Sequence, residues 1–203
     1  NKELDYVRGF LRWCREEKGI NAPPFDFKKL KHARPIPMVL SPAEVVRIID
    51  AAGPFHRAFF LCLYTLGLRL SEARYLTWGD IDFGNKTVQT IQKGGTYKIL
   101  PLNNWLKKAL VKLKPGKAGD FIFLNPLTGK PVRDIRAALN TAAKKAGVIK
   151  HVYPHLFRHS VATHMMGENV NLRKIQMYLG HSVISTTEWY THVVTDHLKE
   201  ATG

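Results

Sequence analysis

The sequence predicts an α+β fold that is mainly helical and carries one small three-stranded antiparallel sheet. Apolar residues repeat with helical spacing through most of the 203 residues, and helix-start signals recur along the chain. The spacing changes to short β-favouring runs only between residues 78 and 102. Apolar residues make up 45% of the chain, which supports a full core, and no apolar run approaches the ~20 residues of a membrane-spanning helix.

The first 37 residues differ from the rest of the chain. Apolar residues on one stripe predict a helix over residues 3–18. Residues 21–37 hold four prolines, several lysines and little periodicity, which is typical of a linker. We therefore expect residues 1–20 to be the tail of a preceding domain, most of it absent from a chain that begins without Met, and residues 38–203 to be a separate domain.

Capping signals and glycines delimit the next helices. The capping box Ser41-Pro42-Ala43-Glu44 predicts that a helix starts there. A second helix is expected from about Pro54 to Leu66, ending at Gly67, and a third begins around Arg69.

Changes in the spacing of apolar residues along the chain predict the sheet and the later helices. Breaks at Gly84-Asn85 and Gly94-Gly95 separate three short strands between residues 78 and 102, and the last hairpin turns at Lys93-Gly94-Gly95. Helical spacing then predicts helices over residues 104–113, 132–146, 154–166 and 172–179, and a short pair from residue 185 onward.

The chain is strongly basic, with a formal net charge of +15 and a pI near 9.9. Such an excess attracts polyanions, of which nucleic acid is the commonest in a cell. Charge alone leaves open a solvated surface without a partner, a histone-like binder or a membrane-surface protein. Between residues 102 and 158 only Asp120 and Asp134 oppose a set of twelve cations: Lys107, Lys108, Lys112, Lys114, Lys117, Lys130, Arg133, Arg136, Lys144, Lys145, Lys150 and Arg158.

Cysteines and metal-binding patterns are sparse. Cys14 and Cys62 lie in helical apolar patterns, so we expect buried thiols in a reducing compartment, the cytoplasm. His155, His159 and His164 lack the Cys partners of a structural zinc site, and no His-Glu-x-x-His, Walker loop, nucleotide-binding glycine fingerprint or Gly-x-Ser-x-Gly elbow occurs. We expect neither a metal nor a cofactor.

Two segments present arginines beside a helix start. Arg69 follows the helix-ending Gly67, and Glu72 comes three residues later, close enough to orient it. His155 and Arg158 share one face of the helix that starts at Pro154, and this polar edge is expected to face outward. A guanidinium can hold a phosphate with two parallel hydrogen bonds, which lysine cannot. Taken singly, a local ion pair and a solvated surface pair are the commoner explanations of these residues.

Three further segments carry polar residues at element ends. Gly180 ends a helix and projects His181, a second capping box from Ser185 to Glu188 starts a short helix with Tyr190, and Lys93 lies at the hairpin tip. Each alone has a structural interpretation: a capping histidine, a core tyrosine and a solvated lysine.

Together the five segments resemble the tyrosine recombinase (phage integrase) family in order and spacing, from about Ser41 to the end. The resemblance implies the catalytic-domain fold of DNA breaking-rejoining enzymes over residues 38–203. It makes residues 1–20 the last helix of a truncated N-terminal core-binding domain and residues 21–37 the interdomain linker. The matching pieces are Thr65–Glu72, Lys93-Gly94-Gly95, His155–His159, Leu179–Ser182 and Tyr190-Thr191-His192.

The resemblance assigns a role to each matching residue. Tyr190 is expected to attack a DNA phosphate and leave a 3′-phosphotyrosyl bond, without metal or ATP. Arg69, Arg158 and His181 are expected to hold the non-bridging oxygens of that phosphate.

The resemblance also implies proton-transfer and supporting roles. Lys93 is the expected general acid, His155 handles a proton, and Glu72 supports Arg69. If Tyr190 is not the nucleophile, Tyr178 and Tyr153 are the next candidates.

The expected function is a site-specific recombinase or integrase, bacterial or phage-encoded, acting on double-stranded DNA. The resemblance implies a homotetramer in the synaptic complex and a monomer off DNA. The main alternative is a type IB topoisomerase-like nicking and closing enzyme. A non-catalytic DNA binder would have lost an active-site residue, and a metal-dependent nuclease needs carboxylate clusters that the sequence lacks.

Overall fold

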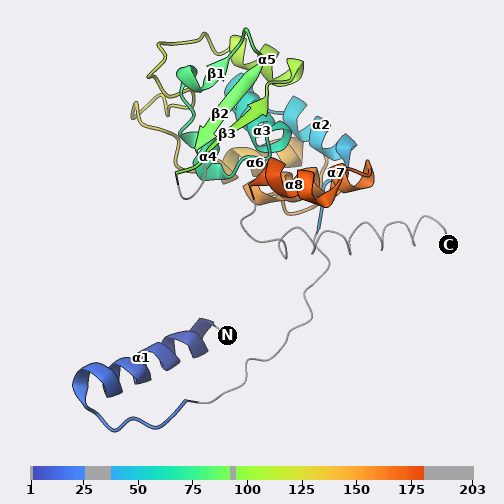
Figure 1. Ribbon diagram of the computed structural model, residues 1–203. Helices are drawn as coiled ribbons and strands as arrows, with labels where there is room; N and C mark the ends of the chain where they lie inside the picture. The colour runs from blue at the N-terminus through green and yellow to red at the C-terminus, as the bar shows by residue number, and fades with distance from the viewer. Residues whose placement is uncertain (1, 26–37, 92–94, 181–203) are drawn as a thin grey trace, which may run out of the picture. The chain divides into compact units, whose positions relative to one another are not determined.

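A computed structural model describes residues 2–25, 38–91 and 95–180 of the chain. The chain divides into two compact units, Asn1–Pro35 and Ile36–Gly203 (Figure 1). In the first unit, helix α1 (Lys2–Lys18) has acidic residues in its first turn and basic residues in its last, which suits the helix dipole. No described helix is long and apolar enough to cross a membrane.

The helices of the second unit surround α3 (Pro54–Thr65). Six consecutive residues of α3, Ala58 to Leu63, are buried, because α2 (Pro42–Asp50), α5 (Asn104–Val111) and α7 (Pro154–Gly167) all pack against it. A helical segment buried on every side must be apolar on every side, and these six residues are all apolar. Cys62 lies in this core, and both cysteines are free and buried, as predicted.

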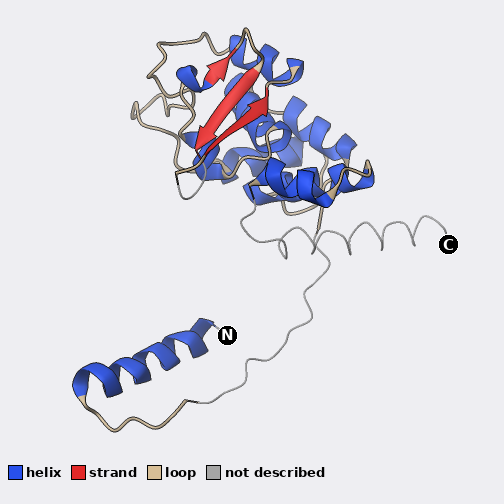
Figure 2. Cartoon of the chain, in the orientation of Figure 1, coloured by secondary structure: helices blue, strands red, loops and turns tan. Residues whose placement is uncertain are grey.

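One face of the sheet packs against this helical layer (Figure 2). Strands β1 (Ile81–Asp82), β2 (Thr87–Ile91) and β3 (Tyr97–Pro101) pair antiparallel in the order β1-β2-β3, after a short 3-10 helix over Trp78–Asp80. Because side chains alternate along a strand, Val88, Thr90 and Leu100 are buried while their neighbours are partly or fully exposed. The predicted three-stranded sheet is confirmed.

The sequence prediction was wrong about where one helix starts. Residues 132–146 were expected to be helical, yet α6 begins at Arg136 and runs to Lys145. The backbone N–H of Val132 donates instead to the carbonyl of Phe123 at 2.9 Å, and Asp134 accepts from the backbone N–H of Arg136 at 2.9 Å. Val132 and Ile135 are buried although they precede the helix, so their apolar pattern resembled helical spacing.

The C-terminal ends of α3 and of α8 (Leu172–Leu179) lie close together. Helix α3 leads into Gly67, which has a φ of +59°, and then into α4 (Leu70–Arg74). Helix α8 ends at Gly180, with a φ of +66°. A Cβ atom on Gly67 would lie 2.6 Å from Leu179 Cδ2, so only glycine allows this approach. This junction positions the candidate site.

Candidate active site

Arg69 is oriented by Glu72 at the start of α4. The Glu72 carboxylate accepts from the Arg69 backbone N–H at 2.9 Å and from its guanidinium at 2.6 Å. The Glu72 side chain is 8% exposed and the Arg69 side chain 30%. A largely buried carboxylate thus fixes a cation that solvent can reach, and the predicted local pairing is present.

Arg158 joins the two helix ends described above. It lies on α7 and is 4% exposed, so the expectation that this polar edge faces outward was wrong for Arg158. Its guanidinium donates to the carbonyls of Gly67 and Leu179. The Arg69 guanidinium donates to the next carbonyl, that of Gly180, at 3.3 Å. Two arginines from distant parts of the sequence therefore converge on the end of α8.

Lys98 is a third cation at this junction and was not among the site residues predicted from the sequence. Its Nζ donates to the carbonyl of Tyr178 and lies 5.3 Å from the centroid of the Tyr178 ring. The pKa of Lys98 is lowered to about 8, mainly by burial and also by the positive charges of Arg158 and Arg69, against an opposing effect of Glu72. Strand alternation could have revealed Lys98, since it pairs with the buried Thr90.

His155 completes the described cluster. Burial lowers the pKa of His155, and the positive charges of Arg158 and Arg69 lower it further, against a smaller opposing effect of Glu72. The ring is therefore neutral near pH 7 and can accept a proton. The ring of His159, one turn later, is 6.5 Å away between centroids, and burial with the nearby His155 and Arg158 lowers its pKa to about 4.

Two open hollows lie at this cluster. The first has a volume of about 480 Å³ and is bordered by Arg69 and Glu72 on one side and by Thr90 and Ile91 on the other. The second, of about 540 Å³, is lined by His155 with the side chains Leu70, Arg133, Asp134, Arg136, Tyr153 and Pro154. Among the described residues, the first hollow contains one cation, Arg69, with the carboxylates of Glu72 and Asp80, and the second contains Arg133 and Arg136 with one carboxylate, Asp134. The lining of the second hollow is therefore the more basic of the two.

The structure brings four of the seven predicted site residues together: Arg69, Glu72, His155 and Arg158. The other three, Lys93, His181 and Tyr190, lie outside the described residues. Among residues 2–25, 38–91 and 95–180, no group of three His, Cys, Asp or Glu side chains could hold a metal ion.

The two alternative nucleophiles can be located. The Tyr178 hydroxyl donates to the carbonyl of Thr65, and burial raises the pKa of Tyr178 to about 12, so it is a poor nucleophile. Tyr153 precedes α7 and lines the hollow that contains His155.

Comparison with known proteins decides the family. Residues 38–197 match the model of the phage integrase family. The chain belongs to the phage integrase family. A tyrosine recombinase XerC from Oceanobacillus iheyensis is 33% identical over 219 residues, covering 99% of this chain and 72% of that protein. This confirms the family and the kind of enzyme that the sequence predicted, and the topoisomerase alternative is not favoured.

Solved structures confirm the fold of this phage integrase family member. A XerA recombinase superimposes with a TM-score of 0.71 at 24% identity, covering 98% of this chain and 81% of that one. The Tn1549 transposon integrase, in complex with circular intermediate DNA, gives a TM-score of 0.72 at 23% identity, covering 100% and 78%. The predicted mainly helical catalytic-domain fold with a small antiparallel sheet is therefore correct.

Proposed function

We propose that the chain is a site-specific recombinase that cleaves and rejoins double-stranded DNA through Tyr190. The Tyr190 hydroxyl oxygen attacks the phosphorus and loses its proton, while the bond to the 5′-oxygen breaks and that oxygen takes up a proton. The products are a 3′-phosphotyrosyl bond and a free 5′-hydroxyl. A 5′-hydroxyl from another strand reverses the step and displaces the tyrosine. No ATP is required, because the phosphotyrosyl ester retains the energy of the original bond.

One observation carries this proposal: the guanidiniums of Arg69 and Arg158 converge on the end of α8. In the sequence, that end leads directly to His181 and then to Tyr190. Negative charge builds on the non-bridging oxygens as the phosphorus becomes five-coordinate. Two fixed guanidiniums and the imidazole of His181 would stabilise that charge, and each such donor contributes about 2.7–4 kcal/mol elsewhere.

We assign proton transfer to His155 and Lys93. A tyrosine with an unperturbed pKa of about 10 attacks poorly unless its proton is removed or its charge is stabilised. The lowered pKa of His155 supports a role in handling that proton, since a neutral ring accepts one. Lys93 is assigned the protonation of the departing 5′-oxygen, a role that typically contributes 10²–10⁴-fold in rate.

The wider interface is also part of the proposal. The cations between residues 102 and 158 follow the DNA backbone, residues 1–20 belong to a core-binding domain, and residues 21–37 link it to the catalytic domain. The exposed Arg133 beside His155 supports the backbone contact, whereas the neighbouring Arg136 is ion-paired with Asp134 at 2.7 Å. We assign a monomer off DNA, a homotetramer in the synaptic complex, and the cytoplasm as the site of action, which the free cysteines support.

The test uses a nicked suicide substrate, which loses a short 5′-hydroxyl fragment after cleavage and traps the covalent product. In the presence of EDTA, the wild-type protein should give a protein–DNA adduct on a denaturing gel. Tyr190→Phe should bind the same DNA and give no adduct. An adduct that persists in Tyr190→Phe would contradict the proposal, and Tyr178→Phe and Tyr153→Phe would then locate the nucleophile.

A further inference from the structure

The carbonyl groups of the last two residues of α8 and of Gly180, which caps the helix, are each held by a different cation. A helix leaves its final carbonyls without intrahelical partners, and these carry the negative end of the helix dipole. Here Lys98 of β3 donates to Tyr178, Arg158 of α7 donates to Leu179, and Arg69 at the start of α4 donates to Gly180. Three elements are therefore fastened to one helix end by consecutive backbone oxygens.

We propose that Lys98 is a positioning residue for DNA strand cleavage: it anchors the end of α8 and thereby fixes the carbonyls that orient Arg158 and Arg69. This inference rests on the proposed function and adds one residue to it. Lys98 acts through the helix end, whereas the two arginines bind the phosphate. It lies outside the hairpin tip, so its role differs from the one assigned to Lys93.

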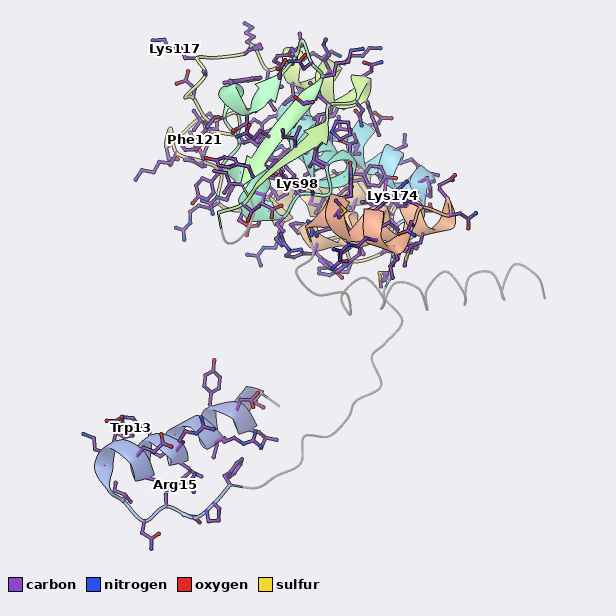
Figure 3. The ribbon with its side chains drawn as sticks, in the orientation of Figure 1. Trp13, Arg15, Lys98, Lys117, Phe121 and Lys174 are labelled. Carbon is purple, nitrogen blue, oxygen red and sulfur yellow. The ribbon has the colours of Figure 1, made fainter. Side chains whose placement is uncertain are left out.

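Lys98 lies on the inner face of the sheet, where its ammonium group contacts the end of α8. It pairs with Thr90, which is 3% exposed, and so lies on the face of the sheet that packs against the helices. Figure 3 shows Lys98 between the sheet and α8. Its ammonium group contacts both the carbonyl of Tyr178 and the face of the Tyr178 ring. That ring is itself fixed, since its hydroxyl donates to Thr65 at the end of α3.

Electrostatics support a functional reason for this lysine. Burial and the nearby charge of Arg158 disfavour the ammonium form, although Glu72 opposes them, and the resulting pKa of about 8 still leaves it charged at neutral pH. An apolar residue would avoid this desolvation cost. The groups that face Lys98 are Arg69 and Glu72 from α4, Arg158 from α7, and the carbonyl end of α8.

Loss of the Lys98 contact would release the first of the three carbonyls. The end of α8 could then shift, and the carbonyl partners of Arg158 and Arg69 would move with it. A misplacement of about 1 Å in a reacting geometry can cost on the order of 100-fold in rate. The effect should appear in the cleavage rate at saturating DNA, while DNA affinity should change little.

The experiment compares wild type, Lys98→Met and Lys98→Arg in single-turnover adduct formation on the nicked substrate. Each protein is given DNA with either oxygen or sulfur at the bridging 5′ position, because a thiolate leaves without a proton donor. We expect Lys98→Met to slow both substrates by a similar factor, on the order of 100-fold. Lys98→Arg should recover most of the rate, since it keeps the charge and the donors.

Arg57→Met is the matched control. Arg57 also holds helix-terminal carbonyls, those of Ile49 at 3.2 Å and Asp50 at 2.6 Å, at the end of α2. Removing it should lower the unfolding temperature without changing the cleavage rate of the folded protein. If Lys98→Met is unfolded at the assay temperature, Lys98→Gln replaces it, and the rate must again fall well below that of Lys98→Arg.

Two outcomes would overturn the inference. Unchanged cleavage in the folded Met or Gln variant would show that the α8 anchor is dispensable. Selective rescue by the sulfur substrate would show that Lys98 is itself the proton donor. Absence of any adduct with the wild-type protein would instead contradict the proposed function, so the two failures are distinguishable.

Discussion

At the residue scale, the Glu72 carboxylate is the support on which Arg69 depends. Glu72→Gln leaves one oxygen where two are used and places an amide NH₂ group against a guanidinium. We expect a loss of about 1–3 kcal/mol in the free energy of unfolding and a further drop in cleavage rate, because Arg69 keeps its charge and loses its orientation. Urea unfolding and single-turnover adduct formation would measure the two effects.

Glu44 provides a matched control for Glu72. It holds the equivalent position in α2, accepts from the Ser41 backbone N–H at 2.7 Å and pairs with Lys150 at 2.8 Å. Glu44→Gln should also destabilise the protein, yet its folded fraction should cleave DNA at the wild-type rate. Equal cleavage losses in both variants would mean that Glu72 has only a structural role.

Single residues also show what the sequence could and could not predict. The pairing of Glu72 with Arg69 is local, so a spacing of three residues predicted it. The burial of Arg158 depends on α8 and on the Gly67 turn, which are remote in the sequence. Lys98 was missed for a related reason: strand alternation places it on the buried face of the sheet, but its partner is a backbone carbonyl of α8, which side-chain patterns do not indicate.

At the element scale, the Gly67 turn determines how closely α3 and α8 approach. Gly67→Ala would place a Cβ atom 2.6 Å from Leu179 Cδ2, on a backbone whose φ is +59°. The left-handed conformation alone costs about 1–2 kcal/mol. The buried Leu179 side chain must also move to make room, and we expect this to disturb the end of α8 that Arg158 contacts. We expect a lower melting temperature and a lower cleavage rate per folded molecule.

Gly147→Ala separates these two effects. Gly147 follows α6 with a φ of +66°, and a Cβ atom there would meet nothing within 4 Å. Gly147→Ala should lower the melting temperature, because alanine is strained in the left-handed conformation, but it should not lower the cleavage rate. A normal cleavage rate in Gly67→Ala would show that the close approach of α8 is not needed for the reaction.

The elements that the sequence predicted correctly are those with local end signals. The capping box at Ser41 and the glycines after α3 and α8 all mark helix ends in the structure. The start of α6 was wrong because Val132 pairs with Phe123, a contact between segments that no local signal encodes. How the helix ends assemble into a site is likewise a property of packing between distant segments.

At the scale of the whole molecule, the net charge of +15 favours binding to polyanions, while the number of phosphate contacts sets how that binding depends on salt. Each phosphate contact releases counterions, so the logarithm of the binding constant falls with the logarithm of salt concentration, with a slope of about −0.9 for each contact. Arg133 is exposed and lines the hollow that contains His155. Arg133→Gln should therefore weaken binding to all duplexes similarly and make the slope shallower by about 1.

The measurement titrates intact duplex with Tyr190→Phe protein, which cannot cleave, over a series of salt concentrations. Arg47→Gln is the control, because Arg47 is exposed on α2 and lines neither of the two hollows. Both variants lose one positive charge, so a contribution of net charge alone would change both slopes equally. A shallower slope in Arg133→Gln alone would place a phosphate beside His155, because counterion release is a local property of the contact surface.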